Sequence, residues 1–190
     1  MRFLLALVLW LLPALAAAAP WSVVEDQTRV EVDVTYRGMV VVMRFDTVKG
    51  NILFDERQPQ TARASIVVDT RDVTTGFFIA DRIVRSEAYL NVKAYPRVDF
   101  RLDRLVRTSE STADIFGQIR FWGIERPVML KATVFSYGPN EDAGGRFDAG
   151  FTLTGEIDRT EFGHTTGLPQ VAAVLPIRIR LLMRSDMPIQ

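Results

Sequence analysis

Residues 76–100, with the sequence GFFIADRIVRSEAYLNVKAYPRVDF, decide the fold because a helix here interrupts a chain that is otherwise almost all strand. Ile79 and Ile83 lie on one helical face and Arg82 leans toward the other, a spacing typical of a short amphipathic helix. The two-residue alternation found on both sides of this stretch is absent within it. We therefore expect one helix over about residues 77–87.

The sequence also predicts the limits of this helix. Thr74-Thr75-Gly76 is typical of a turn that leads into a helix, with a threonine as the N-cap. The residue before Pro96 is restricted to extended or turn conformations, so the helix must end before it. Residues 97–102 alternate charged and apolar side chains again, which predicts a strand directly after the helix.

The rest of the chain consists of strand-like stretches joined by short polar or glycine-containing links. Most of them alternate apolar and polar residues, as half-buried antiparallel strands do. These stretches are residues 28–36, 39–45, 48–55, 64–69, 97–106, 115–121, 128–134, 147–157 and 173–183. They predict about eight long antiparallel strands, which can form a sandwich or close into a barrel. An eight-stranded barrel has an interior that side chains fill or that holds one small ligand.

The first residues have the features of a secretory signal peptide. A basic residue at position 2 precedes an apolar run over residues 3–15 and a tail of small residues over 14–19. We expect cleavage after Ala18, so that residues 19–190 form a single exported domain. An uncleaved N-terminal anchor is the alternative, although the run is short for a membrane span. No later stretch is long and apolar enough to span a bilayer.

Composition excludes several classes of protein. The 23 basic and 23 acidic residues balance, whereas a nucleic-acid-binding protein normally has a basic excess. The chain has no cysteine, so disulfides, thiolate metal sites and a lipid anchor on an N-terminal cysteine are excluded.

Residues suited to catalysis are few. His164 is the only histidine, and no nucleophile motif or metal-ligand spacing accompanies it, so we expect a solvent-exposed loop residue. Asp69, Asp72 and Asp81 lie near one another in the sequence, but such residues more often cap turns or pair with arginines than act as acids and bases. We therefore expect no enzyme activity, no metal and no cofactor.

Aromatic residues are the more informative group. Phe45, Phe54, Phe100, Phe121 and Phe151 each lie in the apolar row of a separate predicted strand. Filling of the core is the simpler interpretation, and the alternative is that they line a cavity for a long apolar ligand. Each five-carbon unit of such a ligand would gain roughly 4 kcal/mol on burial, at about 0.8 kcal/mol per carbon. A few units would outweigh the cost of association without a charged anchor.

Four segments, in order and with consistent spacing, resemble the YceI-like family of bacterial polyisoprenoid-binding, lipocalin-like proteins. They are residues 50–55 (GNILFD); Thr75-Gly76 with Asp81, Arg85-Ser86, Tyr95-Pro96 and Phe100; residues 117–130 (GQIRFWGIERPVML); and residues 157–163 (IDRTEFG). The resemblance covers nearly the whole chain from Trp21 to about Met183.

This resemblance implies an extended, eight-stranded antiparallel barrel with the short helix near one end. It also implies a periplasmic protein, often a homodimer, that carries or sequesters a long isoprenoid lipid such as a polyprenol, a polyprenyl phosphate or a quinone-like chain. The residues expected to contact the lipid are Phe45, Phe54, Phe78, Ile83, Phe100, Phe121, Phe151 and Leu153. Arg37 and Arg82 are the candidates for contact with a polar head group at the mouth.

The chain departs from the family pattern at several positions. Gln27-Thr28 stands where family members usually have His-Ser, and Phe78-Ile79-Ala80 lacks the acidic residue usually found shortly before Asp81. Trp122 and Arg120 are bulky for their positions. A narrowed cavity would bind a shorter lipid or nothing, so the alternative function is a ligand-less interaction module in the cell envelope, for example in stress responses.

Overall fold

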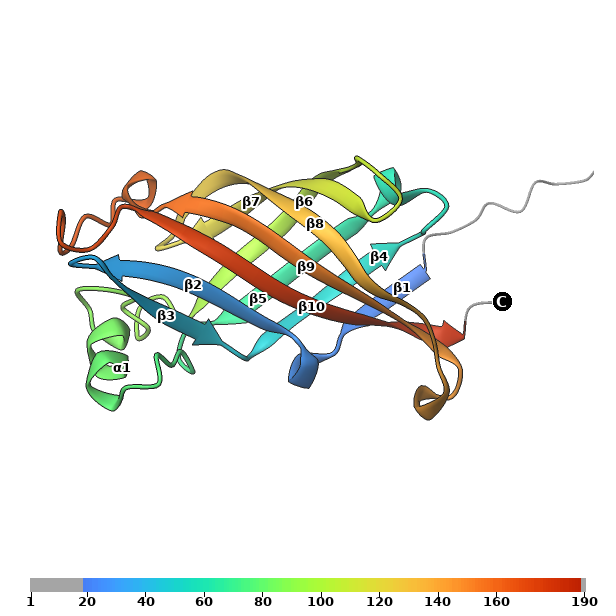
Figure 1. Ribbon diagram of the computed structural model, residues 1–190, viewed down its shortest axis with the longest axis horizontal. Helices are drawn as coiled ribbons and strands as arrows, with labels where there is room; N and C mark the ends of the chain where they lie inside the picture. The colour runs from blue at the N-terminus through green and yellow to red at the C-terminus, as the bar shows by residue number, and fades with distance from the viewer. Residues whose placement is uncertain (1–18, 189–190) are drawn as a thin grey trace, which may run out of the picture.

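The computed structural model describes residues 19–188, so the predicted signal peptide over residues 1–18 lies outside the described residues (Figure 1). Strands dominate the fold. They are β1 (Ala19–Val23), β2 (Arg29–Tyr36), β3 (Met39–Phe45), β4 (Val48–Phe54), β5 (Arg63–Asp69), β6 (Arg97–Arg107), β7 (Thr112–Phe121), β8 (Ile124–Asn140), β9 (Arg146–Asp158) and β10 (Val174–Pro188). The α-helix in this range is α1 (Phe78–Arg85), and no helix of the described chain has the length and apolar character needed to cross a bilayer.

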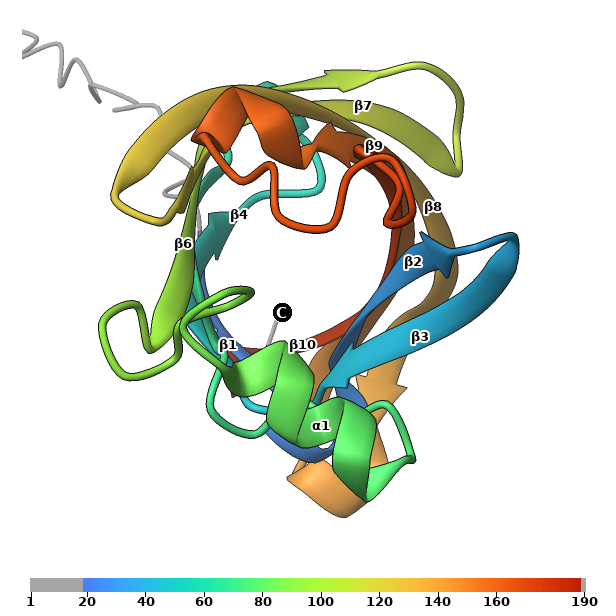
Figure 2. The same cartoon turned by 90° about the vertical axis from the view of Figure 1, so that its left-hand side faces the viewer.

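All strands belong to one antiparallel sheet that closes on itself. The order is β1-β4-β5-β6-β7-β8-β9-β10-β2-β3, and β1 also pairs with β10. Eight strands therefore form a closed ring, which confirms the predicted eight-stranded antiparallel barrel. β2 and β1 pair with successive parts of β10: β2 over Ile177–Arg180 and β1 over Met183–Ser185. The β2–β3 hairpin therefore lies outside the eight-stranded ring, next to β1. Figure 2 looks along the barrel from the end that carries α1.

β1 was not predicted as a strand, because five residues are too few to show a clear alternation and Pro20 is one of them. Its placement has a simple explanation. Trp21 pairs with Ile52 on one side and with Ser185 on the other, and its side chain is buried. β1 thus closes the ring because it pairs with the edge of β4 on one side and with the edge of β10 on the other.

Close packing inside the barrel requires small residues at particular positions. Gly117 lies on β7 next to Phe100 on β6, and a Cβ atom at Gly117 would lie 2.5 Å from the Phe100 ring. Only the absence of that atom lets the ring lie across the neighbouring strand. Gly117 is thus the small residue that makes room for the Phe100 ring.

α1 and its flanking loops lie at the rim of one end of the barrel (Figure 2). The predicted threonine N-cap is wrong: Phe77 is the N-cap residue and makes no side-chain cap. Instead, the Asp81 carboxylate accepts hydrogen bonds from the Thr75 backbone N–H at 2.6 Å and from Thr75 Oγ1 at 2.7 Å. The turn before the helix is therefore held by a residue inside the helix.

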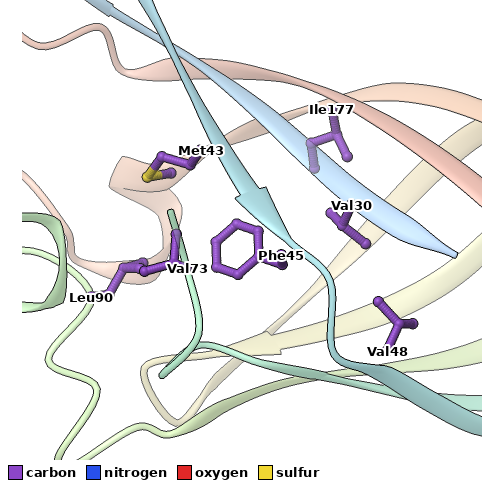
Figure 3. Packing of buried hydrophobic residues seen from close by; sticks show 7 residues of the cluster. All are labelled: Val30, Met43, Phe45, Val48, Val73, Leu90 and Ile177. Carbon is purple, nitrogen blue, oxygen red and sulfur yellow. The ribbon is translucent and has the colours of Figure 1, made fainter. Parts of the chain in front are cut away.

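The segments on either side of α1 close this end with apolar side chains. Val73, which precedes the helix, is fully buried, and Leu90, which follows it, is 9% exposed. Both pack with Met43 and Phe45 of β3 in one buried cluster (Figure 3). The segments on both sides of α1 thus add buried apolar side chains to this end of the barrel.

Candidate functional site

The interior of the barrel holds a cavity of about 260 Å³. A single water needs roughly 10–15 Å³ by this kind of measure, so the space is far larger than a packing defect. Side chains from β2 to β10 line it, and every lining residue within the described part of the chain is apolar except Arg159. Such a space suits an apolar ligand and offers little to a polar one.

Six of the predicted contact residues lie together around this cavity. They are Phe45, Phe54, Phe100, Phe121, Phe151 and Leu153, from five different strands. Phe54 and Phe151 meet edge to face across the interior with their ring centroids 6.4 Å apart. The alternation of each strand brings these side chains to one wall because successive residues of a strand point to opposite faces.

The structure does not bring Phe78 and Ile83 to the cavity. Phe78 is 76% exposed and Ile83 is 50% exposed, on the outer face of α1. Two hydrogen bonds explain this orientation of the helix. Asp81 accepts one from Thr75, and Arg85 donates one to the carbonyl oxygen of Val73. These contacts turn the Asp81–Arg85 face toward the barrel and the isoleucine face toward solvent.

Arg37 and Arg82 also lie away from the cavity. Arg37 follows β2 in the left-handed backbone region, with φ of 49°, and lines a separate hollow with Pro169 and Gln170. Arg82 is exposed on α1. Neither guanidinium therefore reaches a ligand held inside the barrel, because a residue must line a cavity to contact its contents.

Arg159 is the charged group that sequence reasoning missed. Its side chain is 3% exposed and closes the α1 end of the cavity. The guanidinium donates hydrogen bonds to the backbone oxygens of His164, Val171 and Ala172 at 2.8–3.0 Å. No carboxylate in the described range forms an ion pair with it, so these backbone oxygens and His164 Nδ1 are its hydrogen-bond partners. Its position was predictable in principle, because it continues the inward row of β9 two residues after Ile157.

The expectation that His164 is solvent-exposed is wrong. The side chain is 6% exposed and lies edge-on to Trp122, with ring centroids 4.7 Å apart. Its Nδ1 lies 2.7 Å from Arg159 Nη1, and its Nε2 has no hydrogen-bond partner. Burial and the Arg159 charge lower the pKa of His164, with an opposing effect from the backbone of Ala88 and Tyr89. The ring is thus neutral, accepts at Nδ1 and helps to hold the loop that closes this end.

The three aspartates have structural roles. Asp69 pairs with Arg71, and that contact lowers the pKa of the Asp69 carboxyl. Asp72 accepts a hydrogen bond from the backbone N–H of Thr47 at 2.9 Å. Asp81 holds the turn before α1, as described above. Within residues 19–188 there is no group of three or more histidine or carboxylate side chains placed to hold a metal ion.

The other end of the barrel carries a second chamber of about 260 Å³. It adjoins the main cavity, because the two spaces share five lining residues: Phe54, Leu105, Ala113, Ala132 and Phe151. The remaining lining residues are mostly polar and come from the β4–β5 and β6–β7 loops and from β6, β7 and β8. They are Glu56, Pro59, Arg107, Glu110, Ser111, Thr112, Val134 and Tyr137. A polar vestibule therefore meets the apolar cavity at the end opposite α1.

Fold and site together define a closed antiparallel β-barrel with an apolar internal cavity. The sequence matches the profile of the YceI-like domain over residues 21–183, and the chain belongs to that family. It is similar to UPF0312 proteins from Pectobacterium carotovorum subsp. carotovorum (31% identity over 124 residues) and Pseudomonas savastanoi pv. phaseolicola (29% over 114 residues). These matches span 65% and 60% of this chain and 63% and 58% of the two relatives, so each covers less than two thirds of the relative.

Solved structures show the same fold. Burkholderia cenocepacia BcnA superimposes with a TM-score of 0.75 at 18% identity, over 84% of this chain and 98% of that one. A Campylobacter jejuni YCEI protein gives 0.70 at 18%, over 77% and 86%. A polyisoprenoid binding domain from Saccharophagus degradans, implicated in plant cell wall breakdown, gives 0.65 at 12%, over 87% and 98%. At these identities the likeness establishes the shared architecture.

Proposed function

We propose that this protein binds a long-chain isoprenoid lipid in the barrel cavity and carries or sequesters it in the periplasm. The observation that supports this most strongly is the cavity wall, which is apolar at every lining position except Arg159. The similar fold of a polyisoprenoid binding domain from Saccharophagus degradans supports the same ligand class. The proposed ligand contacts are the six cavity-lining residues Phe45, Phe54, Phe100, Phe121, Phe151 and Leu153.

The energetics of such binding require no reactive group. Burial of one isoprene unit contributes roughly 4 kcal/mol, and association costs about 4–15 kcal/mol. Three or four units therefore suffice for useful affinity. A binding role without catalysis is accordingly part of the proposal, and so is export by the predicted signal peptide. The predicted homodimer also remains a proposal.

A ligand-less interaction module is the second candidate. One observation favours it: α1 exposes Ile83 and, at its start, the consecutive residues Phe77, Phe78 and Ile79, and exposed apolar patches often mark interaction sites. An interior filled by side chains would support this candidate further. The cavity of about 260 Å³ counts against it.

Mass spectrometry of an organic extract tests the two functions. The full chain is expressed in a bacterium that has an outer membrane and a periplasm. The protein is purified from the periplasmic fraction and extracted with organic solvent. We expect a prenyl lipid at a fixed ratio to protein. The variant Ala64→Trp, which fills the cavity from β5, should lose the lipid, and its outward-facing neighbour Ser65→Trp should keep it. Extracts that repeatedly lack prenyl lipid, or equal lipid in both variants, would contradict the proposal.

A further inference from the structure

We propose that the lipid enters through the chamber opposite α1 and that its polar head rests there as a neutral hydrogen-bonding group, such as an alcohol, phenol, quinone or amide. This inference rests on the proposed function and adds the direction of binding and the head-group chemistry. Three sets of contacts carry it: the closure of the α1 end, the continuity at the opposite end and the charges around the chamber.

The α1 end is closed by buried side chains held in place from several directions. Val73 and Leu90 fill the space beside β3, and Trp122 Nε1 donates a hydrogen bond to the Leu90 backbone oxygen at 3.1 Å. Arg159 ties the loop over residues 164–172 to the end of β9 through three backbone oxygens. Opening this end would break these contacts together and expose the buried side chains of Val73 and Leu90 to water, which is costly.

The opposite end offers a continuous path. Ala113 of β7 and Ala132 of β8 are directly paired in the sheet, and both line the cavity and the chamber. These small side chains leave room on one side of the junction for a thin hydrocarbon chain, and Phe54, Leu105 and Phe151 form the rest of its wall. Beyond them, the wall changes from apolar residues to Ser111, Thr112 and the charged residues of the loops. That change marks the place where a polar head would stop.

The charges around the chamber favour a head group without a negative charge. Glu56 and Glu110 line it, and neither forms an ion pair with any residue in the described range. Among the described residues, Arg107 is the one basic group in the lining, and its Nε and Nη2 already donate to the backbone oxygens of Ser109 and Glu110 at 2.9 and 3.1 Å. Two carboxylates facing one partly engaged guanidinium repel a phosphate.

A neutral head finds both kinds of hydrogen-bonding partner in the chamber. Burial, a hydrogen bond to Glu56 and the charge of that carboxylate raise the pKa of the Tyr137 hydroxyl, so the phenol keeps its proton, which a bound head group would receive in place of Glu56. The glutamate oxygens accept hydrogen bonds. The Thr112 hydroxyl is already bonded to the Thr108 and Ser109 hydroxyls, both at 2.7 Å. A hydroxyl, carbonyl or amide can use this set without a counter-ion.

The head-group test compares geranylgeraniol with geranylgeranyl phosphate, which share one hydrocarbon chain. The full chain should bind the alcohol more tightly, by about threefold to tenfold at low salt, because each unit charge acts through a partly screened, exposed rim. The double variant Glu56→Lys/Glu110→Lys should reverse that preference. Glu87→Lys, an exposed charge reversal beside α1, is the matched control and should leave it unchanged.

The direction of binding is tested by association rates. Ser111→Trp narrows the chamber without lining the main cavity, and it should slow association of geranylgeraniol at least several-fold. Glu87→Trp adds the same bulk at the α1 end and should not. Circular dichroism establishes that each variant is folded, and Ser111→Phe replaces Ser111→Trp if the latter is not.

The outcomes separate the two levels of the proposal. If neither prenyl ligand binds, the proposed function itself fails. If both bind but the phosphate is preferred, or if Glu87→Lys shifts the preference as much as the double variant, the neutral head group is overturned. If Glu87→Trp slows association and Ser111→Trp does not, the lipid enters at the α1 end and the direction is overturned.

Discussion

Arg159 Nη1 lies 2.7 Å from His164 Nδ1, and both side chains are buried at the closed end of the barrel. An arginine N–H can donate to this nitrogen only while the imidazole is neutral, because a protonated ring carries hydrogens on both nitrogens. Protonation would place two cations side by side in a site without a carboxylate partner. The loop that closes this end of the cavity is therefore sensitive to the charge of one histidine.

The first prediction concerns pH. The pKa of His164 is lowered in the folded state by burial and by Arg159, from an ordinary value of 6.5. The unfolded chain therefore binds a proton more readily, and stability should fall as pH decreases below about 6.5 toward the lower folded pKa. Melting temperatures between pH 7.5 and 5 measure this. His164→Asn keeps an acceptor for Arg159 without the titration, so its melting temperature should change less over that range; an equal change would contradict the prediction.

The second prediction concerns Arg159. Replacement by methionine removes the donors to the His164, Val171 and Ala172 backbone oxygens. Each buried acceptor left without a partner costs about 1–3 kcal/mol, so Arg159→Met should lower the free energy of unfolding by several kcal/mol. Arg159→Lys should restore only part of it, because lysine lacks the planar fork of donors. Urea denaturation measures the loss, and the exposed Arg82→Met should cost almost nothing.

The third prediction separates the cavity wall from the surface of α1. Phe100→Leu and Phe151→Leu remove apolar contacts with the proposed lipid and should weaken binding several-fold each. Phe78→Ser and Ile83→Ser alter exposed residues and should leave affinity unchanged. Competition with a fluorescent prenyl probe gives the affinities. A larger effect from the α1 variants would mean that the lipid lies outside the barrel.

The fourth prediction tests the close packing of β6 and β7. A Cβ atom at Gly117 would lie 2.5 Å from both the Phe100 ring and the Arg101 backbone oxygen. Since backbone atoms cannot move aside cheaply, Gly117→Ala should destabilise the protein by about 1–3 kcal/mol. Gly138→Ala, where a Cβ would meet nothing within 4 Å, is the control. Equal denaturation midpoints for the two variants would show that the barrel wall is more pliable than this packing implies.

Local sequence pattern predicted most of the barrel. Phe100 and Phe151 lie in strictly alternating strands, so their shared inner face follows from the period of a strand alone. The ring closure by β1 was not accessible in this way, because five residues show too little of a pattern and the pairing with β4 and β10 is a tertiary event. Closure itself was anticipated through the family resemblance, not through periodicity.

The face of α1 that points inward could not be predicted from amphipathicity. Ile79 and Ile83 suggested an apolar inner face, yet the contacts from Asp81 to Thr75 and from Arg85 to Val73 turn the opposite face toward the barrel. These partners lie in the preceding loop, whose path the sequence does not reveal. The polar chamber has the same origin, because it forms where the β4–β5 and β6–β7 loops meet β8, and these segments are distant in sequence.

Affinity as a function of isoprenoid chain length tests the central claim most directly. Alcohols of two, three, four and more isoprene units are titrated into the delipidated full chain. Binding inside the cavity predicts a gain of at least several-fold for each added unit, because burial of a unit contributes roughly 4 kcal/mol before ordering costs, followed by a plateau when the space is filled. Affinity that does not depend on chain length would contradict binding of the hydrocarbon within the barrel.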